Sequence, residues 1–143
     1  MTVDQELVDA AIAQARRRYP SGEGGAAAVR TASGVVFTSV GFDNINPGAM
    51  LCHETGAILQ AYARDDAVTA SVCVTRLGTD VTPIILPPCG ICRERLALWG
   101  PDVAVAVPAE DPTVWQSRPL SQVHLSYWGR QFPQDSGWPR TGG

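Results

Sequence analysis

Hydrophobic and polar positions along the chain follow two different periods, and the changes of period divide it into elements. Residues 2–18 carry apolar side chains three and four positions apart, which predicts an amphipathic helix capped by Thr2. Residues 26–31 and 35–42 are strand-like, and the short segment between them predicts a β-hairpin. Residues 43–49 contain two Asn, one Pro and one Gly, which indicates a loop.

Helices and strands alternate in the rest of the chain. We expect a helix over residues 51–63, strands at 68–76, 84–86 and 103–107, a helix that begins at Cys89 and ends near Trp99, and a short final helix at 113–117. This order predicts an α/β domain with some parallel pairing. Residues 129–143 are rich in Gly, Pro and polar residues, so we expect a flexible tail after a single domain of residues 1–128.

Length, charge and composition narrow the class of protein. The 143 residues suffice for one domain with a normal core. The net charge of −3 argues against a nucleic acid polymer as partner, and the run Arg16-Arg17-Arg18 suits the end of a helix. No apolar run approaches the length of a membrane span, and the N-terminus lacks the pattern of a signal peptide. We therefore expect a cytoplasmic protein without a membrane partner.

Three of the four cysteines gather in two short motifs. The first motif is Cys52-His53-Glu54, and the second is Pro88-Cys89-Gly90-Ile91-Cys92. In a reducing compartment such cysteines are more often metal ligands than disulfides. Three thiolates leave one position of a tetrahedral zinc open, as catalytic sites do. The pattern predicts a catalytic zinc held by Cys52, Cys89 and Cys92, with Glu54 beside the open position to move protons.

The expected helix starts suit this chemistry. A helix N-terminus lowers the pKa of a thiol, and Cys89 and Cys92 lie three residues apart, so their sulfur atoms face the same side. Arg93 follows Cys92, where hydrogen bonds to sulfur would offset the excess negative charge of three thiolates. We expect both Arg93 and His53 to lie around the metal ligands rather than among them.

Two other interpretations of the cysteines remain open. A Cys-x-x-Cys pair can be a redox site, although that leaves a third cysteine and its neighbouring glutamate unexplained. A structural zinc would need a fourth ligand, either Cys73 or His53. Cys73 lies in the middle of a predicted strand, which favours a buried core residue. His53 is adjacent to Cys52, and neighbours on a helix point about 100° apart.

The two motifs resemble the signature of zinc deaminases, which is His or Cys, one residue, Glu, and later Pro-Cys-x-x-Cys. The all-cysteine version is similar to small tetrameric cytidine deaminases and blasticidin S deaminases, and the resemblance covers about residues 26–107. It implies a three-layer α/β/α sandwich with a central mixed sheet of about five strands. It also implies a homotetramer or homodimer.

By this resemblance, Cys52, Cys89 and Cys92 would hold Zn²⁺, and Glu54 would be the catalytic acid and base. The implied reaction is hydrolysis of the 4-amino group of a cytosine nucleoside or cytosine nucleoside antibiotic, which gives the uracil product and ammonia. The substrate would be a small molecule of the cytidine, deoxycytidine or blasticidin S type. Two alternatives remain open: a non-catalytic zinc-binding module of the same fold, and a deaminase of a free or modified cytosine base.

The resemblance also implies substrate contacts. Asp43 and Asn44 would bind the sugar, Ala27 would lie beneath the pyrimidine, and Pro87 would lie beside it. Several positions depart from the family: Gly41 replaces a sugar-contacting Asn, His53 replaces the usual Ala of the first motif, Thr55 replaces an Arg, and Glu23 replaces a residue that covers the base. Glu23 would suit a substrate with a cationic group, or it is a solvated loop residue. The departures alter the predicted nucleoside pocket and leave the predicted chemistry intact.

Overall fold

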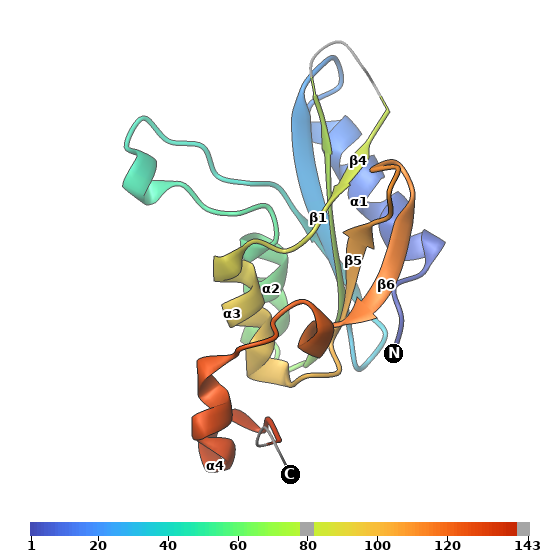
Figure 1. Cartoon of the computed structure of the whole chain (residues 1–143). Coiled ribbons are helices and arrows are strands. Elements are labelled where there is room, and N and C mark those ends of the chain that lie inside the picture. The colour runs from blue at the N-terminus through green and yellow to red at the C-terminus, as the bar shows by residue number, and fades with distance from the viewer. Residues whose placement is uncertain (78–81, 140–143) are drawn as a thin grey trace.

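A mixed sheet of six strands forms the centre of the protein in the computed structural model, which describes residues 1–77 and 82–139 (Figure 1). Along the sheet the strand order is β2-β1-β3-β5-β6, and β4 also pairs with β3. The strands are β1 (Gly24–Thr31), β2 (Val36–Ser39), β3 (Val68–Arg76), β4 (Ile84–Leu86), β5 (Ala104–Pro108) and β6 (Trp115–Pro119).

β3 is the central strand because it pairs on both sides. It is antiparallel to β1 and to β4 and parallel to β5. Successive side chains of a strand point to opposite faces. Val72 and Val74 accordingly pack in the core on one face, whereas Cys73 between them points to the other face, where it lines a cavity. The predicted α/β sheet with partly parallel pairing is confirmed.

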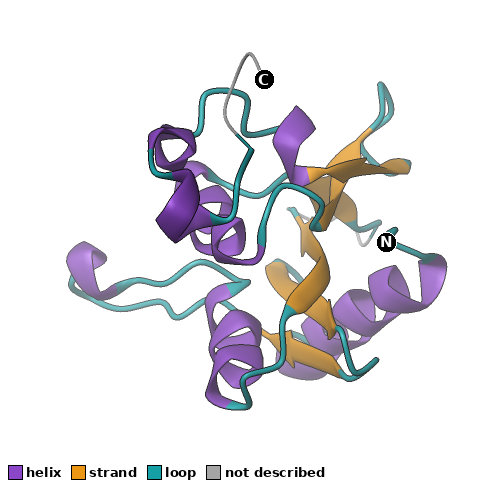
Figure 2. Cartoon of the chain, turned by 90° about the horizontal axis from the view of Figure 1, so that it is seen from below, coloured by secondary structure: helices purple, strands orange, loops and turns teal. Residues whose placement is uncertain are grey.

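Helices cover both faces of the sheet (Figure 2). On one face, α1 (Gln5–Arg18) buries Leu7, Val8, Ala11 and Ala15 against β1 and β3. On the other face lie α2 (Thr55–Ala63) and α3 (Gly90–Leu96), and α3 continues into the short helix η2 (Ala97–Trp99). This arrangement confirms the predicted three-layer sandwich. None of the helices within residues 1–77 and 82–139 is long and apolar enough to span a membrane.

The first helix begins later than its sequence pattern predicts. Asp4, not Thr2, is the cap, and its Oδ1 accepts the backbone N–H of Leu7 at 3.0 Å. Asp4 also forms an ion pair with Arg30 of β1 at 2.8 Å. The N–H of Val3 donates to Ser117 Oγ at 2.9 Å, which ties the residues before Asp4 to β6. This tertiary contact is the reason that the prediction of a Thr2 cap was wrong.

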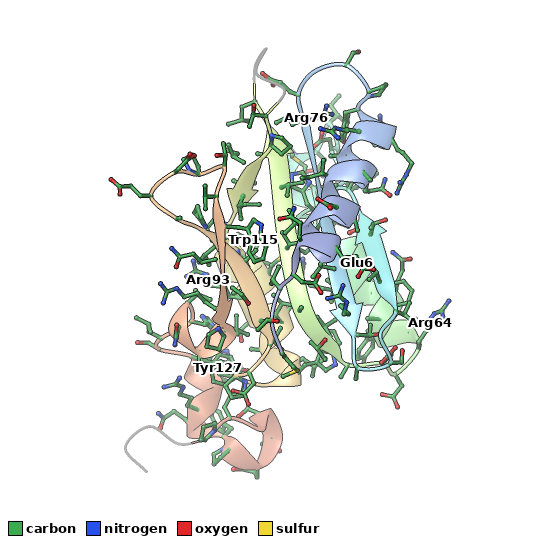
Figure 3. The ribbon with its side chains drawn as sticks, turned by 90° about the vertical axis from the view of Figure 1, so that its right-hand side faces the viewer. Glu6, Arg64, Arg76, Arg93, Trp115 and Tyr127 are labelled. Atoms are coloured by element: carbon green, nitrogen blue, oxygen red, sulfur yellow. The ribbon has the colours of Figure 1, made fainter. Side chains whose placement is uncertain are left out.

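The prediction of a helix at residues 113–117 was also wrong, because this segment leads into the edge strand β6. β6 is antiparallel to β5, and its side chains alternate between half-buried and exposed. A turn precedes the strand, in which Asp111 Oδ1 accepts the N–H and the hydroxyl of Thr113. Trp115 packs against the core cluster that contains the buried residues of α1, and it lies beside that helix (Figure 3). The sheet therefore has one strand more than the predicted five.

The chain after β6 forms three short helices, η3 (Leu120–Gln122), η4 (Trp128–Gln131) and α4 (Pro133–Ser136). This segment contacts α3 and η2. Trp138 is 1% exposed, and its indole N–H donates to the carbonyl of Ala97 at 2.9 Å. Tyr127 lies against Trp138, with a ring-centroid distance of 4.7 Å. The structure therefore differs from the expected flexible tail as far as residue 139, and residues 140–143 lie outside the described part of the chain.

Between β2 and α2 the chain leaves the body of the domain as a long arm, residues 42–51 (Figure 1). Reciprocal backbone hydrogen bonds between Phe42 and Leu51 close the base of the arm, and η1 (Pro47–Ala49) lies near its tip. Every residue of the arm is exposed, and Ile45 is 101% exposed. The arm returns to the domain directly at Cys52.

Replacing Trp138 tests whether the C-terminal segment belongs to the folded domain. We expect Trp138→Ala to lower the free energy of unfolding by about 3 kcal/mol or more, because it removes a fully buried aromatic ring and leaves a cavity. Urea denaturation measures this change. Leu125→Ala is the control, since Leu125 is 71% exposed in the same segment, and we expect a change below about 0.5 kcal/mol. Equal stability of the two variants would contradict the packing of Trp138.

Candidate metal centre

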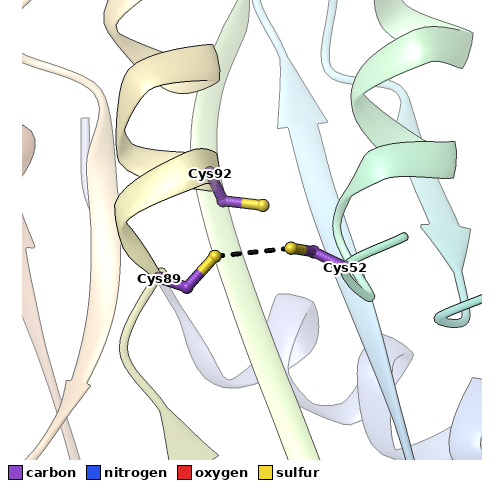
Figure 4. Close-up of side chains that lie close together, drawn as sticks. All are labelled: Cys52, Cys89 and Cys92. Atoms are coloured by element: carbon purple, nitrogen blue, oxygen red, sulfur yellow. Dashed lines mark hydrogen bonds between the residues drawn. The ribbon is translucent and has the colours of Figure 1, made fainter. Parts of the chain in front are cut away.

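Three cysteine sulfur atoms converge where α2 and α3 begin (Figure 4). The sulfur atoms of Cys52, Cys89 and Cys92 lie within 4.8 Å of one another, and those of Cys52 and Cys89 are 3.3 Å apart. Cys52 lies three residues before the first residue of α2. Cys89 is the cap of α3, and Cys92 lies in its first turn. The two segments that the sequence motifs predicted to meet are thus brought together.

The geometry of this cluster fits a zinc ion. Zinc binds thiolate at about 2.3 Å with tetrahedral angles, so sulfur atoms around it lie about 3.8 Å apart. The observed separations, 3.3 Å for one pair and at most 4.8 Å for the others, need only small side-chain rotations to reach this value. Soft thiolates also suit zinc better than hard cations. Three donors leave one position of the tetrahedron open.

The three thiols do not ionise alike. Burial raises the pKa of Cys52, and a hydrogen bond with Cys89 adds to that effect. Burial also raises the pKa of Cys92, with the charge of Glu54 as the next cause. Burial opposes ionisation of Cys89 as well, but hydrogen bonds from the Cys92 N–H and the Cys52 thiol outweigh it, so the pKa of Cys89 is lowered. Of the three thiols, Cys89 at the start of α3 is therefore the one whose surroundings most favour the thiolate.

Glu54 lies beside the cluster, although its place in the chain would suit another role. It is the cap residue of α2, yet its carboxylate makes no capping hydrogen bond. Instead, Glu54 Oε2 accepts the thiol of Cys92 at 3.3 Å, and the side chain is buried, with 4% exposed. The carboxylate thus points to the cluster of three cysteines rather than to the start of the helix.

Ser39 of β2 takes over the capping of α2. Its Oγ accepts the N–H of Ala57 at 2.9 Å and donates to the carbonyl of His53 at 2.5 Å. Gly56 allows this close approach, because a Cβ there would lie 2.8 Å from the Cβ of Ser39. The unpaired N–H groups at a helix start need an acceptor, and a serine from the neighbouring strand supplies one. This contact leaves Glu54 available to the site.

A cavity of about 420 Å³ opens in front of the cluster. Asp43, Met50 and Leu51 of the arm form one side, and Cys73, Leu86 and Pro87 form another. Cys52, Glu54 and Cys89 are among its other walls. Asp43 and Pro87, two of the predicted substrate contacts, therefore face the same space as the metal cluster.

The other predicted substrate contacts lie elsewhere. Ala27 is fully buried in β1, where it pairs with Cys73, so it lies in the sheet beside a residue of the cavity wall. Asn44 is exposed in the arm, and its Oδ1 accepts the N–H of Asn46. Glu23 is exposed before β1. None of these three is among the cavity walls that the described residues form.

The two residues predicted to surround the ligands have different contacts. Arg93 donates from Nε to the carbonyl of Pro88 at 2.8 Å, so its described hydrogen bond holds the loop before Cys89 rather than a sulfur atom. His53 accepts the N–H of Gly41 at its Nδ1, at 2.9 Å. His53 also lines the cavity.

Sequence reasoning missed two features of the site. Ser39 carries no local signal, because it becomes a capping residue only through the packing of β2 against α2. Cys73 was expected in the core and is indeed 4% exposed, but it also lines the cavity. A sign of this was available in the alternation of β3, which places Cys73 on the face opposite to Val72 and Val74.

Comparisons with known proteins give structural matches only. No protein-family model matches the chain, and no curated protein matches it. A crystal structure of the cytidine deaminase from Bacillus anthracis is similar with a TM-score of 0.84 and 37% identity, over 93% of this chain and 94% of that chain. The cytidine deaminase from Mycobacterium leprae has a TM-score of 0.62 and 27% identity, over 82% of this chain and 93% of that chain. The cytidine deaminase from Burkholderia pseudomallei shares the fold, with a TM-score of 0.65 and 22% identity over 85% and 95% of the two chains.

Zinc analysis of cysteine variants tests the metal cluster. We expect about one zinc per chain in the purified protein and a large loss of zinc in Cys52→Ala and Cys89→Ala, because each removes one of the three donors. Cys73→Ala is the matched control, since this buried thiol lines the same cavity but lies outside the cluster. Elemental analysis after gel filtration measures the metal. Equal zinc contents in Cys89→Ala and Cys73→Ala would contradict the assignment.

Proposed function

Since the chain belongs to the cytidine deaminase family, we propose that it hydrolyses the 4-amino group of a cytosine nucleoside, giving the uracil product and ammonia. The observation that carries the proposal is the convergence of three thiols and one buried carboxylate at the wall of a cavity of about 420 Å³. We propose cytidine or deoxycytidine as the first substrates to test, with nucleoside antibiotics of the blasticidin S type next.

We propose Cys52, Cys89 and Cys92 as the zinc ligands. A bound zinc ion acts as a Lewis acid that makes water a nucleophile near neutral pH. The ligands come from the segments that begin α2 and α3, so a bound metal would also tie these two helices together. Arg93 supports Cys89 indirectly, by holding the carbonyl of Pro88 next to it.

Glu54 is the proposed catalytic acid and base. Its carboxylate would accept a proton from the attacking water and donate it to N3 of the pyrimidine. It would then take the proton of the new hydroxyl group at C4 and pass it to the amine, which leaves as ammonia while the C4 carbonyl of the product forms. The position of Glu54 supports this role, because it lies 3.3 Å from a proposed ligand and needs no part in capping its own helix. Burial excludes most competing water from the carboxylate.

We propose Asp43 as the residue that binds the sugar. It lies on the arm at the cavity wall, and a carboxylate accepts hydrogen bonds from hydroxyl groups. Pro87 would contact the base from the opposite side, and Ala27 would support it from within β1 through Cys73. Contacts from Asn44 and Glu23 stay predictions, since they require either residue to approach the cavity when substrate binds.

We further propose a homotetramer in a cytoplasmic location. Two exposed apolar features support association: the arm with Ile45, and a concavity of about 540 Å³ between α2 and α3, with Leu59, Tyr62 and Leu98 among its walls. Exposed apolar surface of this kind marks contact sites. The four cysteines are free thiols, which suits a reducing compartment. Sedimentation equilibrium that gives the mass of a monomer would contradict the oligomer.

Replacing the carboxylate separates an enzyme from a non-catalytic zinc protein. We expect Glu54→Gln to lower kcat by at least about 100-fold while the zinc content stays that of the wild type, because the amide keeps the shape and cannot move protons. Loss of cytosine-type ultraviolet absorbance measures turnover. Glu110→Gln, on an exposed turn, is the control and should keep full activity. Turnover that survives Glu54→Gln would rule out the proposed role.

A substrate panel tests the nucleoside assignment. Asp43→Ala should lower kcat/KM for cytidine by about 10- to 100-fold, because a hydrogen bond to a charged group is lost. The same change should leave activity on free cytosine, which has no sugar, nearly unaltered. Wild-type and variant are compared on cytidine, deoxycytidine, cytosine and blasticidin S, with Asp102→Ala as an exposed control. Equal losses on cytidine and cytosine would contradict sugar binding by Asp43.

A further inference from the structure

The imidazole of His53 occupies a slot between two glycines. A Cβ added to Gly25 would lie 2.6 Å from His53 Nε2, and a Cβ added to Gly41 would lie 2.6 Å from Nδ1. Real Cβ atoms essentially never approach other atoms so closely. The ring can therefore take this position only because both neighbours lack side chains. Gly25 of β1 and Gly41, which follows β2, thus leave the space that the ring of His53 in the first motif fills.

The slot holds the ring by a hydrogen bond as well as by shape. Nδ1 of His53 accepts the N–H of Gly41 at 2.9 Å. The carbonyl of His53 accepts the hydroxyl of Ser39, so the backbone of this residue is held from the same strand that leads into Gly41. His53 is therefore fixed at both its backbone and its ring.

Gly41 is the residue from which the arm departs. The backbone hydrogen bonds described for residues 42–51 join arm residues to one another, as in the Phe42–Leu51 pair. The bond from Gly41 to His53 thus attaches the base of the arm to the segment between Cys52 and Glu54. Asp43 follows two residues later and lines the same cavity as His53. The direction in which the arm leaves Gly41 sets where the Asp43 carboxylate lies.

We propose that His53 is a positioning residue that latches the base of the arm through Gly41 and thereby presents Asp43 to the nucleoside. This inference rests on the proposed function for its substrate, and on the slot geometry for the latch itself. The latch acts on the binding of the sugar end of the substrate. The described contacts of the ring are with Gly41 and Gly25, so we expect the zinc ligands and the Glu54 carboxylate to keep their positions without the latch.

Three variants of His53 separate the acceptor from the shape of the ring. His53→Ala removes both, His53→Leu fills the slot without an acceptor, and His53→Asn keeps an acceptor oxygen the same number of bonds from the backbone as Nδ1. We expect His53→Ala and His53→Leu to raise KM for cytidine by about five- to tenfold, with kcat within about threefold of wild type and zinc content unchanged. His53→Asn should restore KM to within about threefold.

Glycine variants test the slot from its other side. Gly41→Ala should reproduce the KM effect of His53→Ala, since the added Cβ displaces the ring. Gly48→Ala is the matched control on the arm, where a Cβ would lie 3.3 Å from Asn46 Oδ1 alone, and its KM should equal that of wild type. A fall of kcat at constant KM, loss of zinc in His53→Ala, or equal effects on cytidine and free cytosine would overturn the latch.

Amide hydrogen exchange distinguishes failure of the latch from failure of the proposed function. In the wild-type holoprotein the Gly41 amide should be protected, and His53→Ala should expose it together with the base of the arm. His53→Asn should return the protection. If the wild type deaminates none of the substrates but the exchange pattern holds, the function fails and the latch stands. If exchange at Gly41 is the same in wild type and His53→Ala, the latch is wrong whatever the activity.

Discussion

The confinement of three sulfur atoms within 4.8 Å of one another is the constraint on which the rest of the site depends. Burial raises the pKa values of Cys52 and Cys92. Each thiolate that forms also adds negative charge beside the carboxylate of Glu54. Such a cluster is unfavourable as three free anions and favourable around a divalent cation. The packing of α2 against α3 therefore brings the three thiols together, and a divalent cation would offset the repulsion between their thiolates.

The position of Glu54 follows from a division of roles between neighbouring elements. A glutamate at the start of a helix would ordinarily satisfy the helix N–H groups or favour the helix dipole. Here Ser39 of β2 satisfies the N–H of Ala57, and Gly56 lets β2 come close enough to do so. The carboxylate is left to face Cys92 and the cavity. The proposed catalytic carboxylate is thus left available by Ser39, which caps the helix in its place.

The cluster of three cysteines and the cavity in front of it are built from different parts of the chain. The cluster uses the starts of two helices that pack on the sheet, whereas one pocket wall is an exposed arm with few contacts of its own. The slot of Gly25, His53 and Gly41 joins these parts. Gly41 and His53, both expected to depart from the usual family pattern, fit each other sterically in this structure. Changes in the arm can therefore alter this wall of the cavity without moving the three cysteines.

The sequence by itself determined the α/β fold, the hairpin strands β1 and β2, and the central strand β3, because these rest on local periodicity. It also determined which two cysteine motifs would come together, because that prediction rests on residue chemistry. Only the tertiary structure decided that residues 115–119 are an edge strand, that Trp138 is buried, that Ser39 caps α2, and that the ring of His53 contacts Gly41. These features depend on contacts between residues far apart in the chain. A local pattern cannot specify them, since the free energy that selects them appears only when the distant surfaces pack.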